Sequence, residues 1–480
     1  MKRTFLHEAL VGILALSLVN CAKEDLSMTT DKDPTSIEGN GLGEGNGRDE
    51  DSLCRINKET IKYTSADYIS STPSKPIELW TAKQFAALAG NDDALVGHLA
   101  LCRDIEFAGW YSSHPFFKIG EFSTKPFVGS LNGRKKAIRN FRYEVEYTGV
   151  GPTYGIIHTG HGIFGMAKGA SFHDIKVIDA TLHFKTNGSA NIQAAGSLLG
   201  YGDSVLLSNI LALRANVEVT GSGISIGGLV GIAQNSKASH VEVRDSSVKG
   251  TAIINGIGSA LNEITYSLSK NNQVLSTGTG TSSQAISGIG YVQKISWSKA
   301  QDNTVAGYRY VSGAGEGSEM QNVLVTGGTV SGVKYVGGLI SQMYCDEGVI
   351  NPIRNTYTNV SVSGMEAVGG HIGLYGYEQP ANNQSCDEPR EHQSFTTSQV
   401  KENGVSKPAY IGTFNGNGVD KTAFYFDPQA FGMDPSAVSI QSADYFKNAN
   451  NAPMNTWEFA ADKWVMTNGT LDIPSAGYQN

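Results

Sequence analysis

The stretch "GGLVG", Gly227 to Gly231, decides the fold of this chain. A glycine-rich pentapeptide is compatible with two structures: a loop whose backbone amides approach a phosphate, or one unit of a structural repeat. Related glycine-plus-apolar segments begin at Gly162, Gly196, Gly256, Gly288, Gly337 and Gly369, and the seven starts are separated by 34, 31, 29, 32, 49 and 32 residues. Seven segments at nearly constant spacing indicate a repeated scaffold and not a phosphate loop.

A second series of residues runs between the glycine segments with a similar period. Its steps are 34, 35, 31, 32, 31, 19 and 33 residues, so one repeat is irregular where the glycine step is 49. Two interleaved series predict a coiled chain of short strands in which each turn repeats the same corners. Asn tolerates the left-handed conformation of a corner, and stacked amides can bond from one turn to the next. The predicted turn ladder is Asn140, Asp174, Asn209, Asn272, Asn303, Asn322 and Asn355; Asp174 and the intervening His240 depart from asparagine, so the ladder is expected to be imperfect there.

Glycine allows the closest approach between the backbones of successive turns. The glycines expected to serve in this way are Gly162, Gly165, Gly196, Gly200, Gly227, Gly228, Gly231, Gly337, Gly338, Gly369 and Gly370. The apolar residues that follow them are expected to point into the stack.

Composition and charge limit the classes of partner. The chain has 480 residues, 57 of them Gly, and a formal net charge of 37 − 45 = −8. Nucleic-acid binding needs clustered Lys and Arg, so nucleic acid is not expected as a partner. No cofactor and no metal site are predicted.

The N-terminus has the features of an export signal. Lys2 and Arg3 precede an apolar run from Leu10 to Val19, which is too short to span a bilayer as a helix. The run ends at Cys21 in a segment that resembles a bacterial lipobox, which implies a lipid on Cys21 and an outer-membrane location at the cell surface. Ordinary secretion with a free Cys21 is the alternative.

The chain divides into five parts by composition. The predicted boundaries are a signal peptide at 1–20, a flexible tether at 21–73, an N-terminal cap with the first turns at 74–160, the repeat β-helix at 161–425, and a C-terminal cap at 426–480. Within the N-terminal cap, Thr81 and Gln84 form a capping-box pattern that predicts a short helix around Phe85, ending near Gly90.

The chain resembles the GLUG-repeat proteins of bacterial surfaces, through the Gly-Leu-apolar-Gly unit at Gly228 to Gly231. Three further segments match the family's opening: Leu101 to Ile105, Phe127 to Gly133, and Ile138 to Phe141. The segment containing Trp457 and Trp464 resembles the family's aromatic closing cap, and the likeness extends over residues 77–475. The resemblance implies an all-β, right-handed parallel β-helix with a short N-terminal capping helix and a C-terminal aromatic cap.

In the β-helix that this resemblance implies, Cys345 and Cys386 follow successive glycine segments and would lie in loops of neighbouring turns at one corner. The model therefore favours a disulfide between these two residues. The helix near Phe85 and the tryptophan segment are the expected covers of the two open ends of the solenoid.

Several motifs could carry chemistry, but each has a structural interpretation. Gly223 to Gly227 spells G-x-S-x-G without the helix that a nucleophile elbow requires. His158 and His161 in "HTGHG" lack an acidic or Cys partner, so a corner is expected there. The acidic residues between Asp174 and Glu319 give no pair at the repeat offset. The best acidic cluster is formed by the loops "YCDEG" and "SCDEP", and the tyrosines worth inspecting as stacking platforms are Tyr308, Tyr310, Tyr335 and Tyr344.

The sequence thus favours a lipid-anchored surface protein that binds a glycan or another protein without catalysis. A polysaccharide lyase or glycosidase on the same scaffold is the alternative, since such enzymes need paired carboxylates or an acidic calcium site on one face. A purely structural envelope component is the third possibility.

Overall fold

The computed structural model describes residues 54, 59–120, 124–148, 160–187, 192–221, 223–278, 284–343, 353–376, 391–392, 394–406, 411–415, 424–426, 439–441 and 444–479. The chain forms two units, Met1–Arg55 and Ile56–Asn480, and all helices and strands below belong to the second. Several predicted features lie outside the described ranges: Cys21, His158, and the acidic loops 344–348 and 385–389, which contain Tyr344, Cys345 and Cys386. Cys54 and Cys102 are disulfide-bonded. Within the described ranges, no helix has the length and apolar character needed to cross a membrane.

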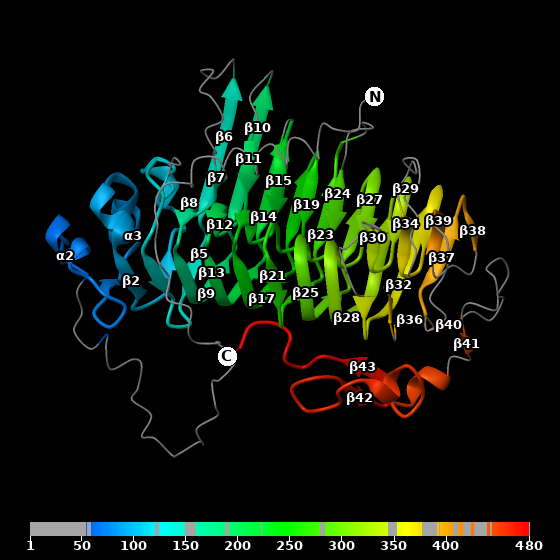
Figure 1. Ribbon diagram of the computed structural model, residues 1–480. Coiled ribbons are helices and arrows are strands. Elements are labelled where there is room, and N and C mark those ends of the chain that lie inside the picture. Colours follow the sequence, from blue (N-terminus) through cyan, green and yellow to red (C-terminus); the bar gives the residue numbers. More distant parts are fainter. Residues whose placement is uncertain are drawn as a thin grey trace, which may run out of the picture. The chain divides into compact units, whose positions relative to one another are not determined.

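Parallel strands stack turn upon turn in the second unit, which confirms the predicted parallel β-helix (Figure 1). Ile175, Ile210 and Val241 occupy the same position on three successive turns, 35 and 31 residues apart. The strands of this face are β9 (Ser171–Ile178), β13 (Leu206–Leu213), β17 (Lys237–Arg244), β21 (Glu263–Thr265), β22 (Leu268–Lys270), β25 (Gly290–Gln301), β28 (Gly315–Ser331), β32 (Tyr357–Gly364) and β36 (Phe395–Thr396).

Three more sets of strands complete each turn. A second face contains β6 (Arg142–Thr148), β10 (Thr181–Asn187), β14 (Asn216–Thr220), β18 (Ser247–Gly250), β23 (Gln273–Ser276) and β26 (Thr304–Ala306). A separate eight-stranded parallel sheet contains β7 (Gly160–His161), β11 (Ile192–Ala195), β15 (Gly223–Gly227), β19 (Ile253–Asn255), β24 (Ala285–Ser287), β27 (Arg309–Ser312), β29 (Lys334–Gly337) and β33 (Glu366–Gly369). The strands after the glycine segments include β8 (Phe164–Lys168), β12 (Leu199–Asp203), β16 (Val230–Gln234), β20 (Gly258–Ser259), β30 (Ile340–Met343) and β34 (Ile372–Gly376).

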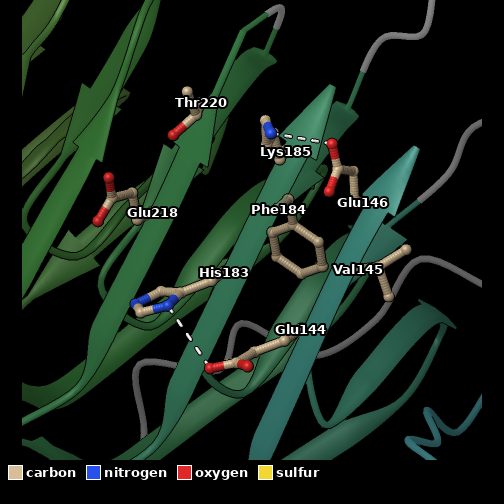
Figure 2. A pocket seen from close by; sticks show the side chains of 8 residues that line it. All are labelled: Glu144, Val145, Glu146, His183, Phe184, Lys185, Glu218 and Thr220. Atoms are coloured by element: carbon tan, nitrogen blue, oxygen red, sulfur yellow. Dashed lines mark ion pairs between the residues drawn. The ribbon is translucent and has the colours of Figure 1, made fainter. Parts of the chain in front are cut away.

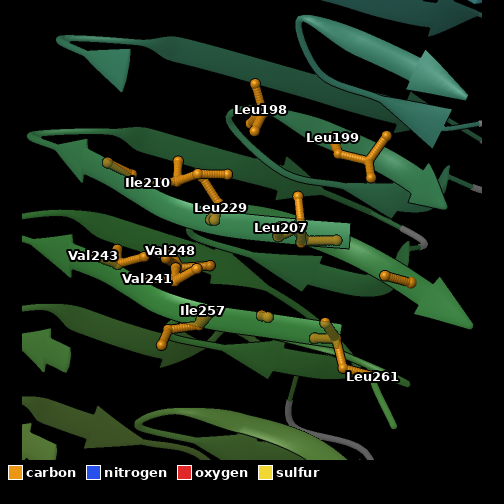
Figure 3. Close-up of a cluster of buried hydrophobic side chains, with 14 of the residues drawn as sticks. Leu198, Leu199, Leu207, Ile210, Leu229, Val241, Val243, Val248, Ile257 and Leu261 are labelled. Atoms are coloured by element: carbon orange, nitrogen blue, oxygen red, sulfur yellow. The ribbon is translucent and has the colours of Figure 1, made fainter. Parts of the chain in front are cut away.

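The core fills the inside of the stack (Figure 3). Leu198, Leu229 and Ile257 follow three successive glycine segments and are fully buried one above another, linked by backbone hydrogen bonds from Leu198 N–H to Leu229 and from Leu229 N–H to Ile257. Burying one such side chain stabilises the fold by about 1.5–3 kcal/mol, so each turn adds to the stability of the stack.

The backbones of successive turns approach closely at the predicted glycines. A Cβ added to Gly338 would lie 2.0 Å from the carbonyl oxygen of Gly370 on the next turn. A carbon added in the same way would also lie within 2.6 Å of a backbone atom at Gly162, Gly165, Gly196, Gly200, Gly227, Gly228, Gly231, Gly337 and Gly369. The space between turns at these positions therefore admits only glycine.

The predicted ladder divides into three columns. Asp174, Asn209, Asn322 and Asn355 share one left-handed corner, which His240, Tyr266 and Trp297 continue on the turns between; φ lies between 48° and 56° at all seven. Asn140 belongs to a second left-handed corner, together with Asp179 and Arg214. A common period of about one turn applies to every position of a turn, so spacing alone assigns these residues to one column wrongly.

Asn272 and Asn303 form the third column, one residue beyond the second corner and inside the stack. Their side chains are 1 % and 5 % exposed. The Oδ1 of Asn303 accepts from the backbone N–H of Asn272 at 2.9 Å, and the Oδ1 of Asn272 accepts from Ser246 N–H at 2.9 Å. These two residues therefore make a buried amide ladder, which satisfies backbone groups that the corner leaves without a strand partner.

The N-terminal cap contains α2 (Ser65–Ile69), β1 (Ile77–Leu79) and α3 (Ala82–Ala86). Thr81 is the N-cap of α3 and accepts from Gln84 N–H, while the side chain of Gln84 accepts from Trp80 N–H instead of the cap residue. The α-helix ends at Ala86, and a 3-10 turn, η2 (Ala87–Gly90), extends it to the predicted end.

The C-terminal segment contacts the side of the solenoid. It contains η5 (Tyr445–Lys447), η6 (Met454–Thr456) and the antiparallel hairpin of β42 (Val465–Thr467) and β43 (Thr470–Asp472). Figure 1 shows this segment, in red, running beside the strands of the first face. The Nε1 of Trp464 donates a hydrogen bond to Asn322 Oδ1, at a corner in the middle of the stack. This differs from the expected cover of an open end, because the face it occupies carries outward apolar side chains that need burial.

Candidate functional site

A groove of about 550 Å3 lies between the side of the solenoid and the C-terminal segment. The strands β25, β28 and β32 provide its floor, and the hairpin β42–β43 with η5 provides its wall. The lining residues are Lys299, Gln301, Thr326, Tyr357, Asn359, Thr397, Phe446, Lys447, Val465, Thr467, Gly469, Thr470, Leu471 and Asp472.

Four polar side chains form a column along the floor of the groove, hereafter the polar column: Gln301, Thr326, Asn359 and Thr397. Strand register aligns Gln301 with Thr326 and Thr326 with Asn359. The pairing of Thr358 with Thr396 places Thr397 next to Asn359. Stacked strands are about 4.8 Å apart, so the column offers one hydrogen-bonding side chain per turn on four successive turns.

A neighbouring column of outward side chains, two residues earlier on each turn, holds the C-terminal segment in place; we call it the side column. It runs through Lys176, Leu211, Glu242, Leu268, Lys299, Leu324, Tyr357 and Phe395. Phe446 stacks on Phe395 with ring centres 4.3 Å apart, and Leu324 is buried in the same cluster as Trp457 and Trp464. The wall of the groove is therefore anchored by apolar packing on this column.

An ion pair joins the floor of the groove to its wall. Lys299 Nζ lies 2.5 Å from Asp472 Oδ1, and the lysine side chain is only 14 % exposed. Asp472 is the one carboxylate among the lining residues. Glycoside hydrolysis generally uses a pair of carboxyl groups on the two sides of the scissile bond, and the described lining holds one carboxylate, from Asp472.

Tyr357 contributes a hydroxyl and a ring to the groove. Its hydroxyl lies 2.8 Å from Thr397 Oγ1, and its ring stacks on Phe395 with centres 4.4 Å apart. Burial raises the pKa of Tyr357 above its usual value, so the hydroxyl keeps its proton and serves as donor as well as acceptor.

A second cluster lies on β6, β10 and β14 around a hollow of about 350 Å3 (Figure 2). Glu144 Oε1 lies 3.6 Å from His183 Nδ1, and Asn216 Nδ2 lies 2.8 Å from His183 Nε2. Glu218 occupies the position beside His183 on the next strand. Lys185 pairs with Glu146 at 2.9 Å. A histidine held by a carboxylate and an amide, with a second carboxylate alongside, could transfer a proton.

The sequence predicts neither site. Glu144 lies before the first glycine segment, and the 39 residues from Glu144 to His183 exceed the repeat step. The groove depends on a hairpin more than 100 residues from the strands that it faces, as Asn359 and Val465 show. The pairing register of the strands, once known, shows which residues of each site lie side by side.

The candidate motifs from the sequence have structural roles in the described residues. Ser225 of the G-x-S-x-G segment lies in β15, is 1 % exposed and donates to the carbonyl of Gly231. His161 is 3 % exposed and packs against the rings of Tyr143 and Phe184, with ring centres 6.0 and 4.7 Å away. Burial and the nearby Lys118 ammonium hold the pKa of His161 well below its usual value.

The tyrosines proposed as stacking platforms also pack internally. Tyr310 and Tyr335 stack with ring centres 5.1 Å apart, and Tyr335 is 3 % exposed. The guanidinium of Arg309 lies over both rings, at 4.8 and 5.3 Å. Tyr308 is half-buried. Tyr335 is therefore buried in an internal stack, with the half-buried Tyr310 packed against it.

Comparisons with known proteins give little further information. No family model and no curated protein matches the chain. Its structure is similar to a crystal structure described as a "putative immunoglobulin A1 protease" from Bacteroides ovatus, at 14 % identity and a TM-score of 0.35, over 84 % of this chain and 94 % of that chain. A likeness at that level carries no argument about function. The resemblance to the GLUG-repeat proteins stays a prediction.

Proposed function

We propose that this chain is a lipid-anchored bacterial surface protein that binds a glycan in the groove between its β-helix and its C-terminal hairpin. The observation that supports the binding role most strongly is the groove itself, a concave site with a polar floor and an aromatic side chain. The anchor and the surface location rest on the sequence, where a basic start and an apolar run precede Cys21.

The lining favours a glycan over a protein segment. Two planar amides, Gln301 and Asn359, and four threonine hydroxyls are distributed along the groove. Amides and hydroxyls both donate and accept, which matches the many hydroxyl groups of a sugar. Protein interfaces are instead centred on buried apolar and aromatic anchors, and here Leu324 and Phe395 of the side column are already covered by the C-terminal segment.

A titration of variants tests this proposal. The full chain carrying Cys21→Ser is applied to an array of bacterial, plant and host glycans, beside the same chain with Asn359→Ala. The control is Ser361→Ala, since Ser361 is an exposed residue of the same strand, β32, and does not line the groove. We expect Asn359→Ala to weaken binding about three- to tenfold, the worth of one hydrogen bond, and Ser361→Ala to leave it unchanged. Equal loss in both variants, or binding to no glycan, would refute the site.

A polysaccharide-active enzyme is the second candidate function, and the cluster on β6, β10 and β14 is the observation in its favour. Glu144 and Glu218 flank His183 on alternate strands, two strand spacings or roughly 9–10 Å apart. That separation is near the range of about 6.5–9.5 Å in which two carboxyl groups hydrolyse a glycoside with inversion. Release of new reducing ends by the wild-type chain, abolished in His183→Ala, would establish this function; its absence leaves binding alone.

A further inference from the structure

We propose that the ligand of the groove is a linear oligosaccharide that lies along the solenoid axis and is read one turn at a time by the polar column. This inference rests on the proposed glycan-binding function and adds the orientation and length of the ligand. It assigns Gln301, Thr326, Asn359 and Thr397 to successive contacts along one chain.

The length follows from the spacing of the column. Four positions on four stacked turns span three intervals, or roughly 14 Å at about 4.8 Å each. That distance exceeds one sugar ring and suits a short chain of rings. Asn359 is exposed and the other three residues are half-buried, so each can reach a ligand while it stays on its own turn.

The orientation follows from what lies on either side of the column. On one side, Leu324 of the side column is 1 % exposed beneath the C-terminal segment, and the Lys299–Asp472 ion pair closes the space above the adjacent turn. On the other side, the strands end at the left-handed corner of Asp302 and Gly327, where the chain turns to the next face. A ligand that crossed the column would therefore meet the wall, whereas one that follows the column meets a new polar side chain at each turn.

Substitutions at the ends and in the middle of the polar column should change glycan binding in different ways. Gln301→Ala or Thr397→Ala removes an end contact. Affinity should then stop rising at a shorter glycan, because one contact fewer remains to be filled. Removing a middle contact, by Thr326→Ala, weakens every chain long enough to reach it about three- to tenfold. Thr329→Ala is the matched control for Thr326→Ala, because Thr329 lies on the same strand, β28, is exposed, and pairs toward β26 on another face.

The experiment measures dissociation constants for linear glycans of increasing length, from monosaccharide to hexasaccharide, of each type retained on the glycan array. We expect affinity to rise with length and to level off once four contacts are filled, with the plateau earlier in the two end variants. A monosaccharide that binds as tightly as the longer chains would overturn the inference but leave glycan binding in place. Binding to a protein or peptide, with no glycan retained, would refute both.

Discussion

Gln479 and Asn209 exchange two hydrogen bonds although 270 residues separate them in the chain. The backbone N–H of Gln479 donates to Asn209 Oδ1 at 2.7 Å, and Asn209 Nδ2 donates to the carbonyl oxygen of Gln479 at 3.0 Å. Between these contacts and the groove, Gly477 N–H donates to the carbonyl of Tyr266 at 2.8 Å. The C-terminal segment is thus fastened over several turns, and the hairpin wall of the groove is fixed from both sides.

Substitution of Asn209 tests this fastening. Asn209→Gly keeps the left-handed corner, since glycine adopts φ near 53° without strain, but removes both hydrogen bonds. We expect the free energy for local opening of residues 473–479 to fall by about 1–3 kcal/mol, the worth of two hydrogen bonds. Hydrogen exchange of that peptide measures the change. Asn235→Gly is the control, because its amide bonds Asp203 on a different corner; equal deprotection in both variants would contradict the fastening.

The close approach of turns at the glycine segments gives a stability prediction. Gly338→Ala places a carbon 2.0 Å from a carbonyl oxygen of the adjacent turn, so both backbones must shift. We expect thermal or denaturant unfolding to show a loss of at least about 1–3 kcal/mol, or no folded protein at all. Gly90→Ala, where an added carbon meets nothing within 4 Å, should change stability by less than about 0.5 kcal/mol. A tolerated Gly338→Ala would mean that the turns are farther apart than described.

The buried side chain of His161 should make the folded chain less stable in mild acid. Its pKa is held well below 6.5 in the folded chain, so the unfolded chain binds a proton more readily. The contribution to the free energy of unfolding is therefore fully present above about pH 6.5 and falls as pH drops through that value, by at most about 1.4 kcal/mol per pH unit. Denaturant titrations of wild type and His161→Gln between about pH 5 and pH 8 should differ in slope. Parallel curves would argue against a neutral buried histidine.

The buried carboxyl of Glu316 should give the opposite dependence of stability on pH. The side chain is 3 % exposed, and burial raises the pKa of its carboxyl well above 4.5. The folded chain keeps the proton that the unfolded chain releases, so the contribution is present below about pH 4.5 and is lost as pH rises through the folded-state pKa. Glu316→Gln should therefore be more stable than wild type at about pH 8 and similar to it at about pH 4. The control Glu319→Gln, which alters a half-buried partner of Lys294 on the same strand as Glu316, should give no such gain.

The sequence predicts the stack better than the surfaces built on it. Glycine segments near 32-residue spacing indicate the turns, because a close approach between backbones excludes every other residue type. The same spacing does not separate Asn209, at a left-handed corner, from Asn272, inside the stack, because each position of a turn recurs with one period. Only the register, in which Tyr266 and Trp297 follow His240, assigns them to their columns.

The candidate sites could not be predicted for a related reason. Lys299 and Asp472 are 173 residues apart, and no local pattern in either segment points to the other. Glu144, His183 and Glu218 lie on successive strands. Because the turns differ in length, no regular spacing in the sequence shows that these three residues are neighbours. Contacts of this kind depend on where the C-terminal segment docks and on how many residues each turn contains.

Simultaneous measurement of retention and cleavage tests the central claim most directly. The full chain carrying Cys21→Ser is mixed with insoluble polysaccharides and whole bacterial cells, and both the protein retained and the new reducing ends released are recorded. We predict retention that Asn359→Ala weakens and Ser361→Ala does not, with no release of sugar ends. Release of sugar ends that depends on His183 would contradict a role without catalysis, and the absence of retention on every surface would contradict a glycan-binding role for the groove.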